Sequence, residues 1–456
     1  MPRFFPQRVR DAEKRGRGGL HKPRTQLHLT RRFETRFSVI FARVALLAAL
    51  VALALPAQAQ ITAIRAGKLV DPETGTTSTN QVILVSDKRI QAVGSNLPIP
   101  AGATVVDLSN ATVLPGLVDA HTHLCIIVQR QFDNGDYFFT TLIRSDSYRA
   151  IEGVANARDM LAAGFTTVRD VGNAGNYADT ALREAVERGL VPGPTIINAG
   201  RIIAPYGGQF HLQPNRRELG EPEYFFADSR DEMRKAIREN IHYGAKVIKI
   251  VVDDQAYIYS AEDIRFIVDE AGKGGLKVAA HVWTHAGARN AAEAGVASIE
   301  HGFAMSDEEL ELARKNGVVL VGTEFTQLAE REMGAPGWHA TMVDRLRRAY
   351  RTGVTMAFGT DTMFGYRGET RGTLAISQLD SWVEAGIPAK DTLKAMTTNA
   401  VRLLGVDGER GAIRPGLAAD IVATPDSPLD NIQTLKSVFF VMKDGAIIRN
   451  NRTAAW

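Results

Sequence analysis

The chain has 456 residues with an ordinary globular composition, 45% apolar and 23% charged, and its length predicts one barrel-sized domain with a smaller companion. The formal net charge of +3 comes from one end, because residues 1–43 hold twelve Lys and Arg against three acids and leave 42 basic and 48 acidic residues elsewhere. This distribution does not indicate a nucleic-acid-binding surface. The single cysteine, Cys125, excludes an intrachain disulfide.

Residues 1–59 have the layout of a basic leader followed by a secretory signal peptide. An uncharged run covers residues 44–55, and the sequence PAQAQ at 56–60 offers a small-x-small site with cleavage after Ala59. The run of twelve is shorter than the roughly 20 residues that span a bilayer. We therefore expect an exported, periplasmic or secreted protein with no stable membrane span after cleavage. A retained anchor is the alternative.

Two segments, one before and one after the long central region, carry short strand patterns. Strands are predicted at 64–69, 81–85, 90–93 and 104–107, and again at 420–424 and 437–442, where residues 443–445 form a hairpin turn. We expect residues 60–115 and 405–456 to pair into one small β-sandwich.

Residues 116–404 repeat a different unit, in which a helical stretch ends at a glycine and a short apolar run follows. The repeats begin at Gly and cover residues 164–170, 244–250, 275–281, 295–301, 317–322 and 353–361. Each glycine suits the left-handed residue that ends a helix. With 117–123 and 195–199 there are eight predicted strands, separated by helical patterns such as 260–272 and 285–294. This predicts an α/β fold with a (β/α)8 TIM-like barrel. A doubly wound open sheet is the alternative, but no Gly-x-Gly-x-x-Gly opens a first helix.

Two histidines end the first predicted barrel strand. Residues two apart on a strand point to the same face, so His121 and His123 converge at the carboxyl end, where one metal ion could bind both. The alternative is that one or both histidines merely cap the strand and hydrogen-bond to a neighbouring residue. Cys125, two residues further on, could be a ligand or nucleophile, although a small buried hydrophobe is the commoner role.

Other predicted strands also end in ionisable residues, and in a barrel the carboxyl ends carry the chemistry. These residues are Lys249, His281, His301 and Asp361. Taken singly, Lys249 could extend to solvent, His301 could donate to a carbonyl and Asp361 could cap a helix. Taken together, they favour a metal site, because several apolar strands place such a residue at the same end.

Six motifs in this order resemble the amidohydrolase superfamily over residues 61–450. They are PGLVDAHTH at 115–123, VIKI at 247–250, VAAH at 278–281, IEHG at 299–302, GTD at 359–361 and GLAAD at 416–420. They are most similar to a branch with Xaa-Pro dipeptidases, carboxypeptidase-like enzymes acting on N-acyl amino acids, imidazolonepropionase-like members and bacterial ochratoxin A-hydrolysing amidohydrolases.

The resemblance implies a binuclear centre, usually of zinc, and a homo-oligomer. His121, His123 and Asp361 would hold one metal ion, and His281 and His301 the other. An N-carboxylated Lys249 would bridge them; Lys246, on the opposite strand face, is the less favoured bridge. A hydroxide between the metals would attack an amide, and Asp361 would carry the proton to the leaving amine.

Substrate contacts are harder to predict. Candidates are Arg169, His211, Tyr257 and His285. Arg169 could instead form a structural ion pair, and His285 could be an exposed residue at a helix start. Segment 124–150 is rich in aromatic residues; such a cluster is more commonly part of the packing, but it would suit a bulky apolar or aromatic substrate. The length, glycines and aromatic residues of segment 201–229 predict a flap over the mouth of the barrel. The sequence at 207–211 departs from the Gly-Gly-His common in the branch, so flap contacts cannot be carried over. A Xaa-Pro dipeptidase, a cyclic-amide hydrolase and a non-catalytic ligand-binding barrel are the alternative functions.

Overall fold

The computed structural model describes residues 60–451. The predicted leader and signal peptide, residues 1–59, lie outside the described residues. Within the described part of the chain, no helix combines the length and the apolar character that a membrane crossing needs.

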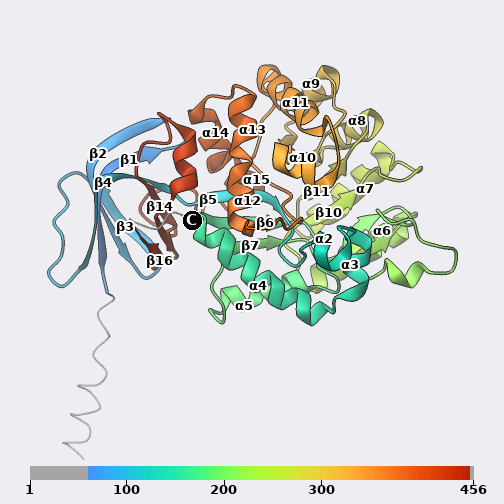
Figure 1. The fold of residues 1–456 in the computed structure, drawn as a ribbon, viewed down its shortest axis with the longest axis horizontal. Coiled ribbons are helices and arrows are strands. Elements are labelled where there is room, and N and C mark those ends of the chain that lie inside the picture. The colour runs from blue at the N-terminus through green and yellow to red at the C-terminus, as the bar shows by residue number, and fades with distance from the viewer. Residues whose placement is uncertain (1–59, 452–456) are drawn as a thin grey trace, which may run out of the picture. The chain divides into compact units, whose positions relative to one another are not determined.

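Parallel strands form the centre of the molecule. Their bounds are β5 (Leu117–Thr122), β6 (Phe165–Asp170), β7 (Thr195–Asn198), β8 (Ile202–Ala204), β9 (Tyr224–Phe226), β10 (Ile248–Val251), β11 (Val278–Val282), β12 (Ser298–His301) and β13 (Val319–Val321). They pair in the orders β5-β6-β7 and β13-β12-β11-β10-β8-β9. These strands and their helices confirm the predicted α/β fold of the TIM-barrel type (Figure 1).

Backbone hydrogen bonds join the two groups of strands at both edges. On one side, the amide of Lys246 donates to the carbonyl of Asn198 at 2.7 Å. On the other, residues 355–361 run between β13 and β5, with Leu320 N to Thr355 O at 2.9 Å and Ala120 N to Phe358 O at 2.8 Å. The eighth predicted strand, 353–361, therefore occupies the expected place, although its only ladder contact among the described residues is a bridge at Met356.

Helices connect most of these strands, although β7 leads directly into β8 and only a 3-10 turn separates β8 from β9. Their bounds are α2 (Arg130–Asp133), α3 (Tyr137–Ile143), α4 (Asp146–Ala162), α5 (Ala178–Glu187), α6 (Arg230–His242), α7 (Ala261–Lys273), α8 (His285–Ala294), α9 (Asp307–Lys315), α10 (Gln327–Met333), α11 (Trp338–Thr352), α12 (Arg371–Ser377), α13 (Leu379–Glu384), α14 (Ala389–Ala395) and α15 (Thr398–Leu404), with short 3-10 turns η1 (Arg217–Leu219) and η2 (Ile432–Ser437). The predicted helices at 260–272 and 285–294 are confirmed as α7 and α8. All six glycines predicted to end helices have left-handed backbones, with φ from 69° to 100°.

The flanking segments share one sheet. Its strands are β1 (Thr62–Asp71), β2 (Thr76–Ser86), β3 (Arg89–Gly94), β4 (Thr104–Pro115), β14 (Ile421–Thr424), β15 (Phe440–Lys443) and β16 (Ala446–Asn450), in the order β16-β15-β14-β4-β1-β2-β3. The long strand β4 pairs with β1 along most of its length and with β14 at its end. The amide of Ile90, in β3, donates to Leu417 O at 2.9 Å, so the sheet curls around a core of its own that includes Ile64, Ile83 and Phe440.

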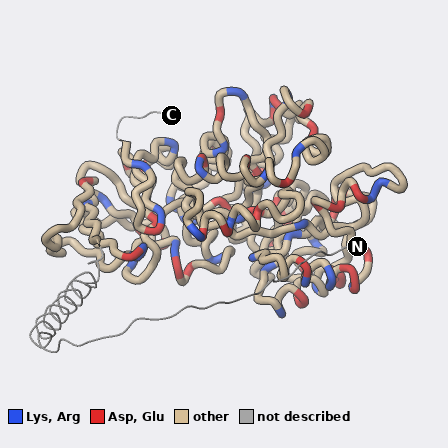
Figure 2. Tube along the Cα trace, turned by 90° about the horizontal axis from the view of Figure 1, so that it is seen from below, with Lys and Arg blue, Asp and Glu red and all other residues tan. Residues whose placement is uncertain are grey.

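The distribution of charge follows the sequence expectation. Figure 2 shows Lys and Arg interspersed with Asp and Glu along the described chain.

Cys125 is fully buried in the main core, and burial raises the pKa of its thiol well above the usual value. It therefore behaves as a small hydrophobic residue at neutral pH.

Candidate metal centre

All six predicted ligand side chains line one cavity at the carboxyl ends of the barrel strands. They come from β5 and the residue after it, from β10, β11 and β12, and from the end of segment 355–361: His121, His123, Lys249, His281, His301 and Asp361. The cavity has a volume of about 520 Å³. The convergence predicted from the ends of the strands is therefore present in the fold.

The two histidines of the first strand present their Nε2 atoms to one carboxylate. Nε2 of His121 and Nε2 of His123 lie 3.3 Å apart, and they lie 3.6 and 3.0 Å from Oδ1 of Asp361. Each ring is fixed from behind, because Nδ1 of His121 lies 2.7 Å from Glu300 Oε2 and Nδ1 of His123 lies 2.9 Å from Gly172 O. Donation from each Nδ1–H would leave the Nε2 lone pairs free for a cation, as in most histidine-bound metal sites.

Backbone geometry holds Asp361 at this point. Its amide and that of Thr360 donate to the carbonyl of His121 at 2.7 and 3.0 Å. Asp361 has φ 50° and His301 has φ 65°, both in the left-handed region that non-glycine residues rarely adopt. Such strain at two predicted ligands is typical of functional sites. Donor atoms of His121, His301 and Asp361 all lie within 4.8 Å of one another, close enough for one ion.

The electrostatics keep the donors in the protonation states that a metal requires. Burial lowers the pKa of His121 to about 3, so its imidazole is neutral. Burial alone would raise the pKa of Asp361, but the nearby His123 and His121 rings and Lys249 hold it at about 2. A neutral imidazole beside an ionised carboxylate is a suitable donor set for zinc.

Lys249 is buried at the same place, with 2% of its surface exposed. Its side chain has no hydrogen bond or ion pair within residues 60–451. Burial lowers its pKa to about 8, against the attraction of Glu300 and Asp361. At pH 7 roughly a tenth of the amine is therefore uncharged, far more than for an ordinary lysine, and the uncharged amine is the form that can react with carbon dioxide.

His281 approaches the cavity from β11. Its Nε2 lies 3.1 Å from Oδ2 of Asp254, but the two atoms are not aligned for a hydrogen bond, and Nε2 has no other partner among the described residues. A buried polar atom without a partner costs free energy. Asp254 itself has φ 111°, which marks strain in the loop after β10.

A chain of hydrogen bonds runs along the cavity wall to Asp254. Nδ2 of Asn173 donates to the hydroxyl of Tyr137, which lies 3.1 Å from the hydroxyl of Tyr224. That hydroxyl donates to Oε1 of Gln209 at 2.8 Å, and Nε2 of Gln209 donates to Oδ2 of Asp254 at 2.8 Å. The chain links the loops after β5, β6, β8 and β10, so the predicted flap is tied to the carboxylate that faces His281.

Aromatic side chains form the remaining wall. Trp283 lies at the centre, with ring centroids 5.1 Å from Phe303 and 5.4 Å from Trp338, and it stacks on His301 at 5.8 Å. Phe325 stacks on Trp338 at 6.1 Å. This wall offers apolar ring faces directly beside the predicted ligands.

None of the four candidate substrate contacts lies in the cavity lining. Arg169 is buried under the ligands, where it forms an ion pair with Glu300 at 2.7 Å and donates to Ser298 Oγ at 2.9 Å. His285 is exposed at the start of α8 and lies 3.1 Å from Glu309. His211 and Tyr257 are also exposed. The structural ion pair that was the alternative for Arg169 is therefore present, with Glu300 as the partner.

Sequence reasoning missed Glu300, Asp254, Asn173, Gln209 and the tryptophan wall. Glu300 stands in the motif IEHG and Asp254 follows β10, so both were visible as polar residues near strand ends. The aromatic segment 124–150 contributes both to the cavity wall and to the packing around it. Tyr137 lines the cavity, while Tyr137 and Phe138 also pack on Phe210 with centroids 5.1 and 4.6 Å apart.

Comparison with known proteins gives consistent matches over most of the chain. The model of the Amidohydrolase family matches residues 112–449. An ochratoxinase from Aspergillus niger is 29% identical over 445 residues, which cover 88% of this chain and 89% of the relative. An imidazolonepropionase from Polaromonas sp. is 27% identical over 383 residues, which cover 78% and 85%.

Solved structures have the same fold. A Xaa-Pro dipeptidase with bound methionine in its active site superposes with a TM-score of 0.75 and 28% identity, over 86% of this chain and 100% of that structure.

Proposed function

The chain belongs to the amidohydrolase family, and on that premise we propose that it is a metal-dependent, carboxypeptidase-like hydrolase. It would cleave the amide bond to a C-terminal aromatic or apolar amino acid. The single observation that carries the proposal is the convergence of all six predicted ligand side chains in one cavity. Ochratoxin A, which joins an isocoumarin acid to phenylalanine by an amide, is the specific candidate substrate; its products would be ochratoxin α and phenylalanine.

The side chains fit a centre of two divalent metal ions, which we infer to be zinc. His121, His123 and Asp361 would hold one ion, and His281 and His301 the other. Two observations support this fit: Nε2 of His121 and Nε2 of His123 both face Oδ1 of Asp361, and Nε2 of His281 makes no hydrogen bond among the described residues. N-carboxylation of Lys249 would turn a buried amine with no counter-ion in contact into an anionic bridging ligand.

When bound, the metal pair would acidify a water molecule and polarise the scissile carbonyl. The residues of the chain supply orientation and proton transfer. Asp361 is ionised and lies beside the histidines, so its carboxylate can orient the attacking water, accept its proton and deliver it to the leaving amine nitrogen. The wall around Trp283 excludes water from one side of the reacting amide.

The same wall supports the choice of leaving amino acid. A cavity of about 520 Å³ lined by Trp283, Phe303, Phe325 and Trp338 suits a phenylalanine or leucine side chain better than a charged one.

A second candidate function is favoured by the comparisons. The Xaa-Pro dipeptidase with bound methionine has the same fold over nearly all of the described chain, so cleavage of a dipeptide that ends in proline is the alternative. Hydrolysis of a cyclic amide is a further alternative, supported by the imidazolonepropionase relative.

A substrate panel tests these functions. Purified protein is supplied with zinc and bicarbonate and incubated with N-acyl derivatives of phenylalanine, leucine and proline, with Ala-Pro and with ochratoxin A, and the released amino acid is quantified. The proposal expects phenylalanine and leucine to be released fastest. Preferential release of proline would favour the dipeptidase, and no release from any substrate would favour the cyclic-amide hydrolase or the non-catalytic ligand-binding barrel. Export and a homo-oligomeric state stay predictions; N-terminal sequencing and light scattering test them.

A further inference from the structure

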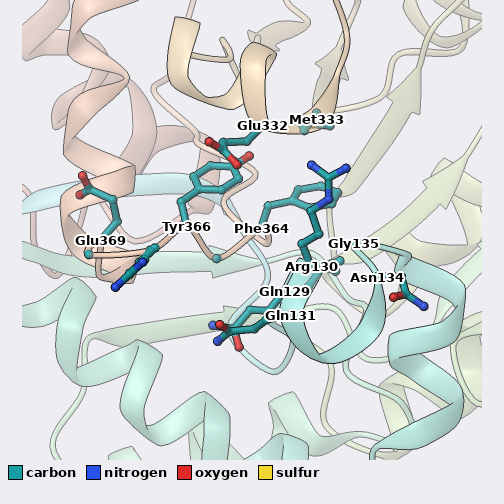
Figure 3. A pocket seen from close by; sticks show the side chains of 14 residues that line it. Gln129, Arg130, Gln131, Asn134, Gly135, Glu332, Met333, Phe364, Tyr366 and Glu369 are labelled. Atoms are coloured by element: carbon teal, nitrogen blue, oxygen red, sulfur yellow. The ribbon is translucent and has the colours of Figure 1, made fainter.

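A second cavity, which we call the outer pocket, opens beside the metal cavity and has a volume of about 660 Å³. It lies between the segment after β5, the end of α10 and the segment after Asp361 (Figure 3). The side chains that matter here are Arg130, Glu332, Met333, Phe364, Tyr366 and Glu369.

The outer pocket adjoins the metal cavity. Met333 and Phe364 line both spaces, and Phe364 follows Asp361 by three residues. A substrate whose amide lies at Asp361 can therefore extend past Phe364 without leaving the protein surface. The metal cavity holds one end of such a substrate, and the outer pocket is positioned to hold the other.

Hydrogen bonds fix the floor of the outer pocket. Val128 and Phe364 form a parallel bridge, with Val128 N to Met363 O at 2.8 Å and Gly365 N to Val128 O at 2.9 Å. The buried carboxylate of Asp133 accepts from the amide of Gln129 at 2.9 and 3.0 Å. Preorganised walls of this kind reduce the entropic cost of binding.

The lining combines ring faces with two arginines, Arg130 and Arg367, and two glutamates, Glu332 and Glu369. Phe364 and Tyr366 present aromatic rings, and burial together with Glu332 raises the pKa of the Tyr366 phenol to about 12, so it remains a neutral donor. Arg130 has no ion pair or side-chain hydrogen bond among the described residues. Glu369 already accepts from Thr373 Oγ1 at 2.6 Å and lies across the pocket from Arg130 in Figure 3.

We propose that the outer pocket is an acyl subsite, selective for an acyl group that combines an aromatic ring with an anionic substituent. The ring packs on Phe364 and Tyr366, and Arg130 binds the anion through its planar fork of donors. This inference rests on the proposed function, because it assigns the acyl half of the same amide substrate.

The test compares two substrates that differ in charge alone, N-(4-carboxybenzoyl)-phenylalanine and N-(4-carbamoylbenzoyl)-phenylalanine. The measured quantity is the ratio of kcat/KM for the anionic substrate to kcat/KM for the neutral one. Arg130→Gln should lower this ratio by roughly fivefold, the effect of about 1 kcal/mol at a partly exposed ion pair. Glu332→Gln should raise the ratio, because it removes a like charge from the lining, and added salt should reduce the ratio of the wild-type protein.

The matched control is Arg158→Gln, which removes an exposed arginine of α4 outside both cavities and should leave the ratio as it is. An unchanged ratio in Arg130→Gln, with the wild-type protein hydrolysing both substrates, would overturn the acyl subsite alone. Failure of the wild-type protein to hydrolyse any acyl-phenylalanine would overturn the proposed function and the subsite with it.

Discussion

Glu300 holds His121 in place: its Oε2 lies 2.7 Å from Nδ1 of the imidazole, on the side of the ring away from the other predicted ligands. Oε1 of the same carboxylate lies 2.7 Å from Arg169. Burial alone would raise the pKa of Glu300, but Arg169 and His121 hold it well below its usual value. The carboxylate therefore stays charged and fixes which nitrogen of His121 faces the cavity.

Replacement of this carboxylate should weaken metal binding without removing a ligand. We expect Glu300→Gln to lower zinc affinity by about 10-fold to 100-fold, the usual cost of losing such a supporting contact. Competition with a chromophoric chelator measures the zinc affinity of the variant and of the wild-type protein. Glu309→Gln is the control, because Glu309 is also buried but bonds Ser306 and His285 at α9, outside the cavity. Equal zinc affinity in Glu300→Gln and the wild-type protein would refute this role.

Lys249 and Lys246 form a natural pair for testing the bridging ligand. Lys249 is buried in the cavity, whereas Lys246, three residues earlier, is exposed. Lys249→Ala should lose metal and activity, and short carboxylic acids should restore part of the activity by occupying the space of the carboxylated side chain. Lys246→Ala should retain both. The idea fails if Lys249→Ala keeps its full metal content.

Asp361 is expected to carry the proton rather than merely to bind metal. Asp361→Asn should abolish turnover, since an amide cannot accept the proton, while most of the metal stays bound through the histidines. Metal content by mass spectrometry and hydrolysis of an acyl-phenylalanine are measured on the same sample. Full activity in Asp361→Asn would rule out this residue as the proton carrier.

Tyr224 is the central member of the hydrogen-bond chain along the cavity wall. Tyr224→Phe removes its contacts to Tyr137 and Gln209 and leaves both partners short of one bond. We expect the free energy of unfolding to fall by about 1 to 3 kcal/mol. Chemical denaturation measures this change. The control is Tyr206→Phe, at a tyrosine that is 51% exposed, and it should change the free energy of unfolding little. Equal decreases in the free energy of unfolding in both variants would show that the hydrogen bonds of Tyr224 are not specifically stabilising.

Much of the fold was predictable because it depends on local patterns. Glycines with left-handed backbones, such as Gly164 and Gly295, follow helices and precede buried strands, and each signal lies within a few residues of sequence. The convergence of the predicted ligand side chains followed from these patterns, since parallel strands bring their carboxyl ends together. Two short strands were not predicted: β8 and β9 lie in segment 201–229, which was expected as a flap.

The supporting contacts were not predictable for a physical reason. Glu300 meets His121 across 179 positions of sequence, and Gln209 meets Asp254 across 45. Such pairs depend on the register of the strands and on the path of the loops, and neither produces a periodic pattern in the sequence. Arg169 illustrates the difficulty, because an arginine at a strand end suits a substrate carboxylate and a buried glutamate equally well, and only the fold shows that Glu300 is its partner.

Metal content measured together with hydrolysis tests the central claim most directly. The account predicts that the purified protein binds two divalent ions per chain, that chelation abolishes release of phenylalanine from an acyl-phenylalanine, and that zinc restores it. A protein that retains no metal, and that hydrolyses no amide of the panel after zinc is added, would contradict the account.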